Sequence, residues 1–188
     1  MTGVQTCALP ISLRLTHALL PRLRAAARPR VVAVTGGEHP SRVQLDNLTG
    51  ERSFVGLTQY SHHKLVMMGV MRGLAHRLDR ITVNVCYPGQ AATRMTQSVT
   101  TRDMPWFMRP FAPLFRLMTR DDGGASADKA SRSSVHLATA PELDGATDRY
   151  FDKNARERPW PKALDDANLR VELWTRALRV AALDENGW

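Results

Sequence analysis

Apolar positions along the chain follow two spacings, and each spacing predicts one kind of element. Nearly continuous apolar runs predict buried strands at 30–34 and 81–87, with a shorter strand at 148–151. Apolar residues three or four positions apart predict helices at 12–27, 61–78, 126–138 and 164–183. Helices that alternate with apolar strands are typical of an α/β protein with a parallel sheet.

Length and composition fit one domain of this class. The chain has 188 residues, of which 43% are hydrophobic and 23% are charged, as in ordinary globular proteins. Its net charge of +8 comes from 22 arginines and 4 lysines, which are scattered through predicted helices and loops and form no single basic stripe. We therefore expect no nucleic-acid partner.

Cysteine, histidine and hydropathy patterns exclude several other classes. Cys7 and Cys86 make no disulfide framework, and Cys86 lies in a predicted strand, where a small core residue is expected. His62 and His63 have no partner cluster at metal-ligand spacing, so we expect packed or exposed side chains and no metal. No apolar run reaches the roughly 20 residues that span a bilayer, and no signal peptide is recognisable. The expected compartment is the cytoplasm.

Tyr60 and Lys64 are the candidate catalytic pair. Residues four apart on a helix project from the same face, and a nearby ammonium favours the phenolate. The spacing predicts that the pKa of Tyr60 lies below its usual value of about 10, which would make the phenol a general acid or base. The alternative is a surface lysine beside a half-buried tyrosine. A site is favoured because the pair stands between two predicted strands, the second of which ends in Pro88-Gly89 and is followed by Thr93.

This arrangement resembles the short-chain dehydrogenase/reductase family, and within it the retinol-dehydrogenase-like branch. The resemblance runs from about Leu13 to about Leu183. It is supported by Leu45-Asp46-Asn47-Leu48 in the loop before the pair and by Glu172-Leu173-Trp174 near the end of the chain. It implies a partial Rossmann-like fold: a doubly wound parallel sheet in three α/β/α layers, of which this chain carries the C-terminal half only.

The resemblance implies a role for each candidate residue. Tyr60 would exchange a proton with the alcohol or carbonyl oxygen of the substrate, and Lys64 would hold the nicotinamide ribose of NAD or NADP. Pro88 and Gly89 would let the backbone pass close to the nicotinamide, although a Pro-Gly pair alone is often an ordinary turn. Thr93 matches the family threonine that binds the cofactor amide or phosphate. The expected cofactor-binding residues are Tyr60, Lys64, Pro88, Gly89 and Thr93.

Two departures from the family pattern put catalysis in question. Gly36 stands where the family has a serine that hydrogen-bonds the substrate carbonyl. Thr35 is adjacent but is expected to face the other way, and Ser41 is a weaker substitute. The glycine-rich Thr-Gly-x-x-x-Gly-x-Gly loop, which binds the cofactor pyrophosphate, does not occur in the 188 residues. We therefore expect the chain as given to be inactive.

The expected function is that of an NAD(P)-dependent oxidoreductase acting on a lipophilic alcohol, aldehyde or ketone. The substrate class comes from the predicted lid at about 94–120, which is rich in aromatic and other apolar residues. This basic, aromatic segment also suits a membrane surface, a role that we rank below the substrate lid. The alternative from another class is a non-catalytic homologue that acts through dimerisation or protein interaction, for which Gly36 is the main argument.

The first eleven residues fit nothing that follows. Residues 2–11 can be encoded by the bases of a widely used sequencing adapter, so we expect 1–11 to be an artefact and 12–188 to be the C-terminal part of one domain. In the family, the helices that correspond to 12–27 and 61–78 commonly form a dimer interface, which implies a homodimer. Gly69 and Gly73 would allow a close contact between helices there.

Overall fold

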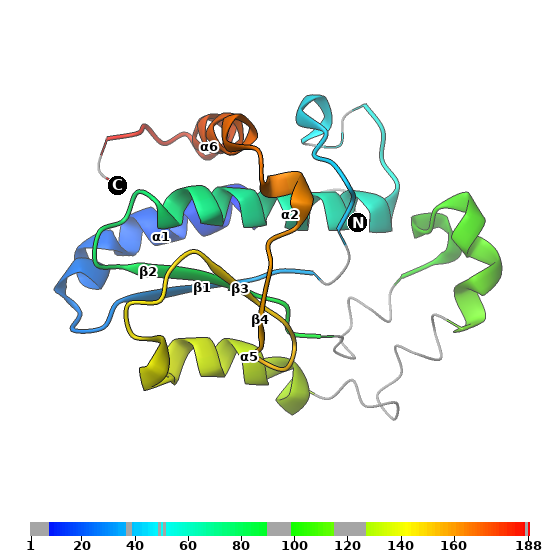
Figure 1. The fold of residues 1–188 in the computed structure, drawn as a ribbon. Helices are drawn as coiled ribbons and strands as arrows, with labels where there is room; N and C mark the ends of the chain where they lie inside the picture. Colours follow the sequence, from blue (N-terminus) through cyan, green and yellow to red (C-terminus); the bar gives the residue numbers. More distant parts are fainter. Residues whose placement is uncertain are drawn as a thin grey trace.

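Helices lie on both sides of a four-stranded sheet (Figure 1). The computed structural model describes residues 8–36, 39–48, 50, 52–89, 99–114, 127–186 and 188. The helices and strands are α1 (Ala8–Ala25), β1 (Arg30–Val34), α2 (Gly56–Ala75), β2 (Thr82–Cys86), α5 (Ala127–Thr139), β3 (Arg149–Phe151), β4 (Glu157–Arg158) and α6 (Ala167–Ala181). Short 3-10 helices lie at Leu45–Asn47, Thr101–Asp103, Trp106–Phe111, Pro141–Leu143 and Lys162–Leu164.

The sheet is open and mostly parallel. Its strand order is β1-β2-β3-β4, in which β1, β2 and β3 are parallel and β4 is antiparallel to β3. Val31 pairs with Val83, and Val85 pairs with Tyr150. Helices α1, α2 and α6 lie on one side, whereas α5 packs against β1 and β2 on the other. The predicted α/β class is confirmed, and the arrangement is that of a partial Rossmann-like fold.

Most predicted elements form close to their expected bounds. The strand at 30–34 is confirmed, and α5 is displaced by one residue. The start of α2 at Gly56 was harder to predict, because Val55 at its N-cap makes no side-chain capping bond. The predicted helix at 164–183 is shorter, since its first residue belongs to the 3-10 helix at 162–164. The sequence did not predict β4, because both of its residues are polar and exposed.

Helix α1 begins inside the segment that we expect to be an artefact. It starts at Ala8, four positions before Ser12. Alanine and leucine favour helices, and Pro10 lies in the first turn, where a missing backbone N–H removes no helical hydrogen bond. Helix formation follows from these residues whatever their origin, so the artefact hypothesis stays a prediction.

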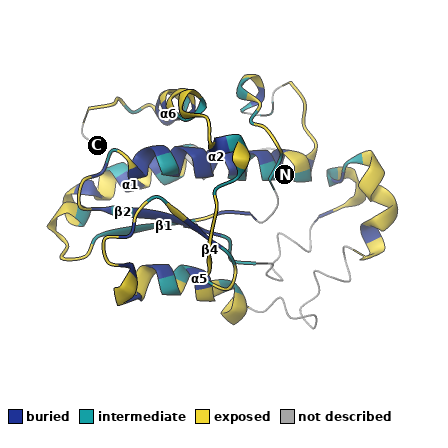
Figure 2. Ribbon diagram, in the orientation of Figure 1, coloured by how far each residue is buried: buried dark blue, intermediate teal, exposed yellow. Residues whose placement is uncertain are grey.

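Helix α2 lies at the centre of the hydrophobic core (Figure 2). Thirteen of its 20 residues are buried, because the helix packs against both β2 and α6. A Cβ atom at Gly69 would lie 2.7 Å from Cδ1 of Leu173 and 3.0 Å from Cδ2 of Leu164. Glycine at this position therefore lets the two helices approach closely. The close contact predicted at Gly69 is made by α6 of the same chain.

This packing buries the apolar face of α2, one of the two helices that were predicted to form the dimer interface. Within the described chain, the apolar residues of α2 are covered by the sheet and α6, whereas Leu15 and Leu19 of α1 are exposed. Helix α1 therefore offers the exposed apolar part of the two predicted segments, and the homodimer stays a prediction. Among the described residues, no helix is both long and apolar enough to cross a lipid bilayer.

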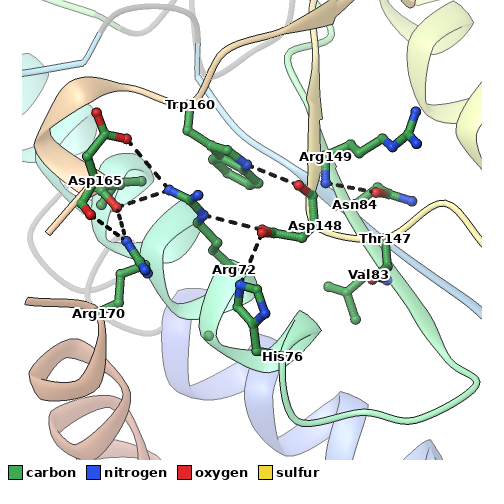
Figure 3. Close-up of polar contacts among 12 residues, drawn as sticks. Arg72, His76, Val83, Asn84, Thr147, Asp148, Arg149, Trp160, Asp165 and Arg170 are labelled. Carbon is green, nitrogen blue, oxygen red and sulfur yellow. Dashed lines mark hydrogen bonds and ion pairs between the residues drawn. The ribbon is translucent and has the colours of Figure 1, made fainter. Parts of the chain in front are cut away.

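A polar cluster connects the C-terminal end of α2 to the residue before β3 (Figure 3). The carboxylate of Asp148 lies 3.3 Å from Nε of Arg72 and 3.1 Å from Nε2 of His76. Its backbone N–H donates to the carbonyl of Val83, and its carbonyl accepts from Nε1 of Trp160. The φ of Asp148 is +57°, which is unfavourable for most side chains and tolerated by aspartate and asparagine. These contacts hold the left-handed backbone in place.

Arg72 extends the same cluster to α6. Its Nη1 donates to the carbonyl of Leu164 at 3.1 Å, and Arg170 in the first turn of α6 donates to that carbonyl at 2.8 Å. The guanidinium of Arg72 also lies over the ring of Trp160, 5.2 Å from its centroid (Figure 3). The cluster therefore ties α2, β3 and α6 together.

We predict that Asp148→Asn lowers the free energy of unfolding by about 2 kcal/mol, because it leaves the half-buried guanidinium of Arg72 with only the more distant, exposed carboxylate of Asp165 at 3.8 Å. Asparagine tolerates the left-handed backbone, so the loss reports on the ion pairs. Chemical denaturation measures the change. The matched control is Glu157→Gln, which breaks the exposed pair with Arg149 and should change stability by less than about 1 kcal/mol. Equal losses in the two variants would contradict this interpretation.

Candidate functional site

The candidate catalytic residues meet at the carboxyl end of β1. Tyr60 and Lys64 lie in the N-terminal half of α2, and Gly36 follows β1 by two residues. A Cβ atom at Gly36 would lie 3.5 Å from Cε1 of Tyr60 and 3.5 Å from Cγ of Lys64, which are ordinary van der Waals distances. The structure therefore brings all three positions together, as the sequence predicts for Tyr60 and Lys64. In parallel α/β sheets, this end of the strands is where ligands bind.

Lys64 contacts the face of the Tyr60 ring. Its Nζ lies 5.6 Å from the ring centroid and donates to the carbonyl of Val34 at 3.3 Å. Burial lowers the pKa of Lys64, because the surrounding protein solvates the ammonium less well than water does. The ammonium is thus held between the end of β1 and the aromatic ring.

The pKa of Tyr60 moves in the direction opposite to the one that the sequence predicts. Burial raises it above its usual value, and the nearby Tyr87 phenol adds a smaller contribution of the same sign. The sequence prediction was wrong because helical spacing shows which residues share a face but does not show how deeply they are buried. In this environment desolvation of the phenolate outweighs the charge of Lys64. Burial therefore favours the neutral phenol of Tyr60 over its phenolate.

The residues that follow β2 lie beside the neighbouring strand β3. Tyr87 extends the pairing with β3, since its N–H donates to the carbonyl of Phe151 at 2.8 Å. Gly89 has a φ of +84°, which favours glycine, and a Cβ atom there would lie 3.3 Å from Cβ of Lys153. Pro88 and Gly89 thus lie directly after the carboxyl end of β2. Thr93 lies outside the described residues.

Neither neighbour of Gly36 supplies the missing serine hydroxyl. Thr35 is buried, and its Oγ1 lies 3.5 Å from the carbonyl of Lys64, to which it donates. Its hydroxyl is therefore directed at the backbone of α2. Ser41 lies in the exposed part of the loop that follows. The position at Gly36 carries no hydrogen-bond donor other than its backbone N–H.

His62 and His63 bind the loop that precedes α2. The backbone N–H of Gln44 donates to Nε2 of His62 at 2.9 Å, and Nε2 of His63 lies 2.5 Å from the carbonyl of Leu48 and 3.2 Å from Nε2 of Gln59. Burial lowers the pKa of both imidazoles, and the charge of His63 lowers the pKa of His62 further. The sequence predicted packed or exposed side chains but gave no signal for this loop contact, because their partners are backbone atoms.

The chain is similar to known dehydrogenases over most of its length. Retinol dehydrogenase 14 of Homo sapiens is 32% identical over 163 residues, which are 85% of this chain and 46% of that protein. Retinol dehydrogenase 13 of Homo sapiens is 28% identical over 174 residues, covering 90% of this chain and 51% of that protein. Polyprenol dehydrogenase of Mus musculus is 29% identical over 175 residues, covering 88% and 49%. No family model matches the sequence.

These similarities agree with the fold. The chain is homologous to retinol dehydrogenases and other members of the short-chain dehydrogenase/reductase family. It spans about half the length of the relatives that it matches. The similarity supports an oxidoreductase of this type, while the roles of individual residues stay predictions.

We predict that Tyr60 ionises above about 10 in the folded chain, since burial opposes the phenolate. The measurement is an ultraviolet titration of the phenolate band, in which the Tyr60→Phe profile is subtracted from that of the unsubstituted chain. Tyr87→Phe serves as the matched control for removing a phenol nearby. A Tyr60 transition below 10 would show that the Lys64 ammonium dominates instead.

We also predict that the contact between His62 and the loop weakens in acid. The pKa of His62 is lower in the folded chain than in the unfolded chain, so the unfolded state binds more protons and stability rises with pH between the two values. The contribution is fully present above the unfolded value of about 6.5 and is lost as pH falls below it. His62→Gln keeps an acceptor for Gln44 and should remove this part of the pH dependence, measured by denaturation at several pH values. An unchanged pH dependence would contradict the assignment.

Proposed function

We propose that this chain carries the catalytic part of an NAD(P)-dependent oxidoreductase that acts on a lipophilic alcohol, aldehyde or ketone. The observation that carries the proposal is the meeting of Tyr60, Lys64 and Gly36 at the carboxyl end of β1 in a homologue of retinol dehydrogenases. The names of the relatives, retinol and polyprenol dehydrogenase, support a long apolar substrate.

The residues present fit the nicotinamide and ribose end of such a cofactor. Gly36 leaves space beside Tyr60 and Lys64, and the left-handed backbone at Gly89 brings the turn after β2 to the same edge of the sheet. Lys64 would donate hydrogen bonds to the ribose hydroxyls, and Thr93 would contact the cofactor from the following segment. Bound NAD or NADP supplies the hydride acceptor or donor. The glycine-rich pyrophosphate loop of the family is not among these residues.

Tyr60 would transfer the proton, and Lys64 would stabilise the phenolate that remains. In carbonyl reduction, the protonated phenol of Tyr60 donates its proton to the developing alkoxide; in alcohol oxidation, the phenolate would accept it. Lys64 keeps a positive charge beside the ring, which favours the phenolate once the proton has left. Gly36 offers no hydroxyl to hold the substrate oxygen, so Tyr60 alone would position it.

A non-catalytic homologue is the second candidate, and the observation that favours it is again Gly36. A chain of this kind would keep the fold and act through dimerisation or protein binding. The exposed Leu15 and Leu19 of α1 would belong to a homodimer interface under either function. A cytoplasmic location is part of the same proposal.

We predict that Gly36→Ser raises the turnover number roughly tenfold to a hundredfold, because it restores a donor to the substrate oxygen. Tyr60→Phe should lower it at least about a hundredfold by removing the proton donor. The test protein joins residues 12–188 to the N-terminal part of human retinol dehydrogenase 14, and the assay follows NADPH oxidation with retinal. Because an added Cβ atom at Gly36 meets only ordinary contacts, the thermal midpoint should not change.

Binding of NADPH, measured by fluorescence, separates folding from chemistry in this test. A chimera that binds NADPH but shows no turnover, with or without serine at position 36, would support the non-catalytic alternative. Turnover that survives Tyr60→Phe would contradict the assignment of the proton donor.

A further inference from the structure

The segment around the third 3-10 helix, Trp106–Phe111, carries large apolar side chains that point into solvent. Trp106 is 80% exposed, Phe107 is 58% exposed and Phe111 is 63% exposed. The side chain of Leu114, shortly after this helix, is exposed as well. Figure 2 shows this segment as an exposed region that projects from the layers of the fold. Exposed apolar side chains gathered in this way mark a binding surface more often than single ones do.

The exposure does not come from a failure of the segment to fold. Met104 and Ala112 are buried and pack with Val99 and Leu57 in a small cluster of their own. Thr100 and Asp103 form a reciprocal capping box, in which the N–H of Thr100 donates to the Asp103 carboxylate at 2.9 Å. The segment is therefore held by its buried residues, while its largest aromatic side chains are directed outward.

Charge decides which partner suits this surface. Arg102 and Arg109 are exposed on either side of Trp106, and the carboxylate of Asp103 is engaged by Thr100. The whole chain has a net charge of +8, so a second copy would bring like charges to the same surface. An anionic surface complements these arginines, and tryptophan and phenylalanine rings favour the boundary between lipid headgroups and acyl chains.

We propose that residues 105–114 dock onto an anionic lipid bilayer. The rings of Trp106, Phe107 and Phe111 enter the boundary between headgroups and acyl chains, and Arg102 and Arg109 contact the lipid phosphates. The proposal concerns an interaction surface and does not depend on catalysis, so it stands or falls separately from the oxidoreductase activity.

The test is co-sedimentation of the full 188-residue chain with vesicles of phosphatidylcholine alone and of phosphatidylcholine mixed with phosphatidylserine. We expect strong binding to the mixed vesicles and weak binding to the neutral ones. Phe107→Asp and Arg102→Glu should each lower the partition coefficient on mixed vesicles about tenfold. Both side chains are exposed, so thermal midpoints should stay unchanged.

Matched controls on α6 separate this surface from general adsorption of a basic protein. Val171→Asp and Arg179→Glu change exposed residues by the same charge and should leave binding within about twofold. Equal losses in these variants and in Phe107→Asp and Arg102→Glu would overturn the proposal. So would the absence of binding to mixed vesicles, or light scattering that shows the surface to be an interface between two copies of the chain.

Tryptophan fluorescence gives an independent readout. Trp106 is the exposed indole, whereas Trp174 is fully buried. Mixed vesicles should shift the emission of the chain to shorter wavelength, and Trp106→Phe should remove this shift while keeping most of the binding. A shift of the same size in Trp106→Phe would show that the ring does not enter the bilayer.

Discussion

The packing of α2 against α6 is the contact on which the rest of the structure depends. At Gly69 there is no room for a Cβ atom, because Leu173 and Leu164 would lie within 2.7 and 3.0 Å of it. One half of α2 presents Tyr60 and Lys64 to the end of β1, and the other half holds Asp148 through Arg72. The position of Tyr60 and Lys64 therefore depends on contacts made further along the same helix.

Burial of α2 also determines the electrostatics of the site. The same desolvation raises the pKa of the Tyr60 phenol and lowers the pKa of the Lys64 ammonium, so it opposes the charged form of both groups. The interaction between the two residues cannot be read as a simple ion pair, since the ammonium lies over the ring and also bonds the carbonyl of Val34.

Some of this could be predicted from the sequence and some could not. The bounds of β1 were predictable because a continuous apolar run identifies a buried strand. The first turn of α2 was not, because Val55 carries no capping signal, and β4 was not, because its residues are exposed. Spacing placed Tyr60 beside Lys64 correctly. It could not give the sign of the pKa shift, which depends on the depth of burial supplied by distant segments.

The glycines around the site differ in what they require. Gly69 is needed for space, and Gly89 is needed for its left-handed backbone. Gly36 has neither requirement, because its φ is not in the left-handed region and a Cβ atom would make ordinary contacts with Tyr60 and Lys64. Packing and backbone conformation therefore do not account for glycine at this position. Under the proposed function, what Gly36 changes is the chemistry of the site, since a side chain at this position would lie beside both Tyr60 and Lys64.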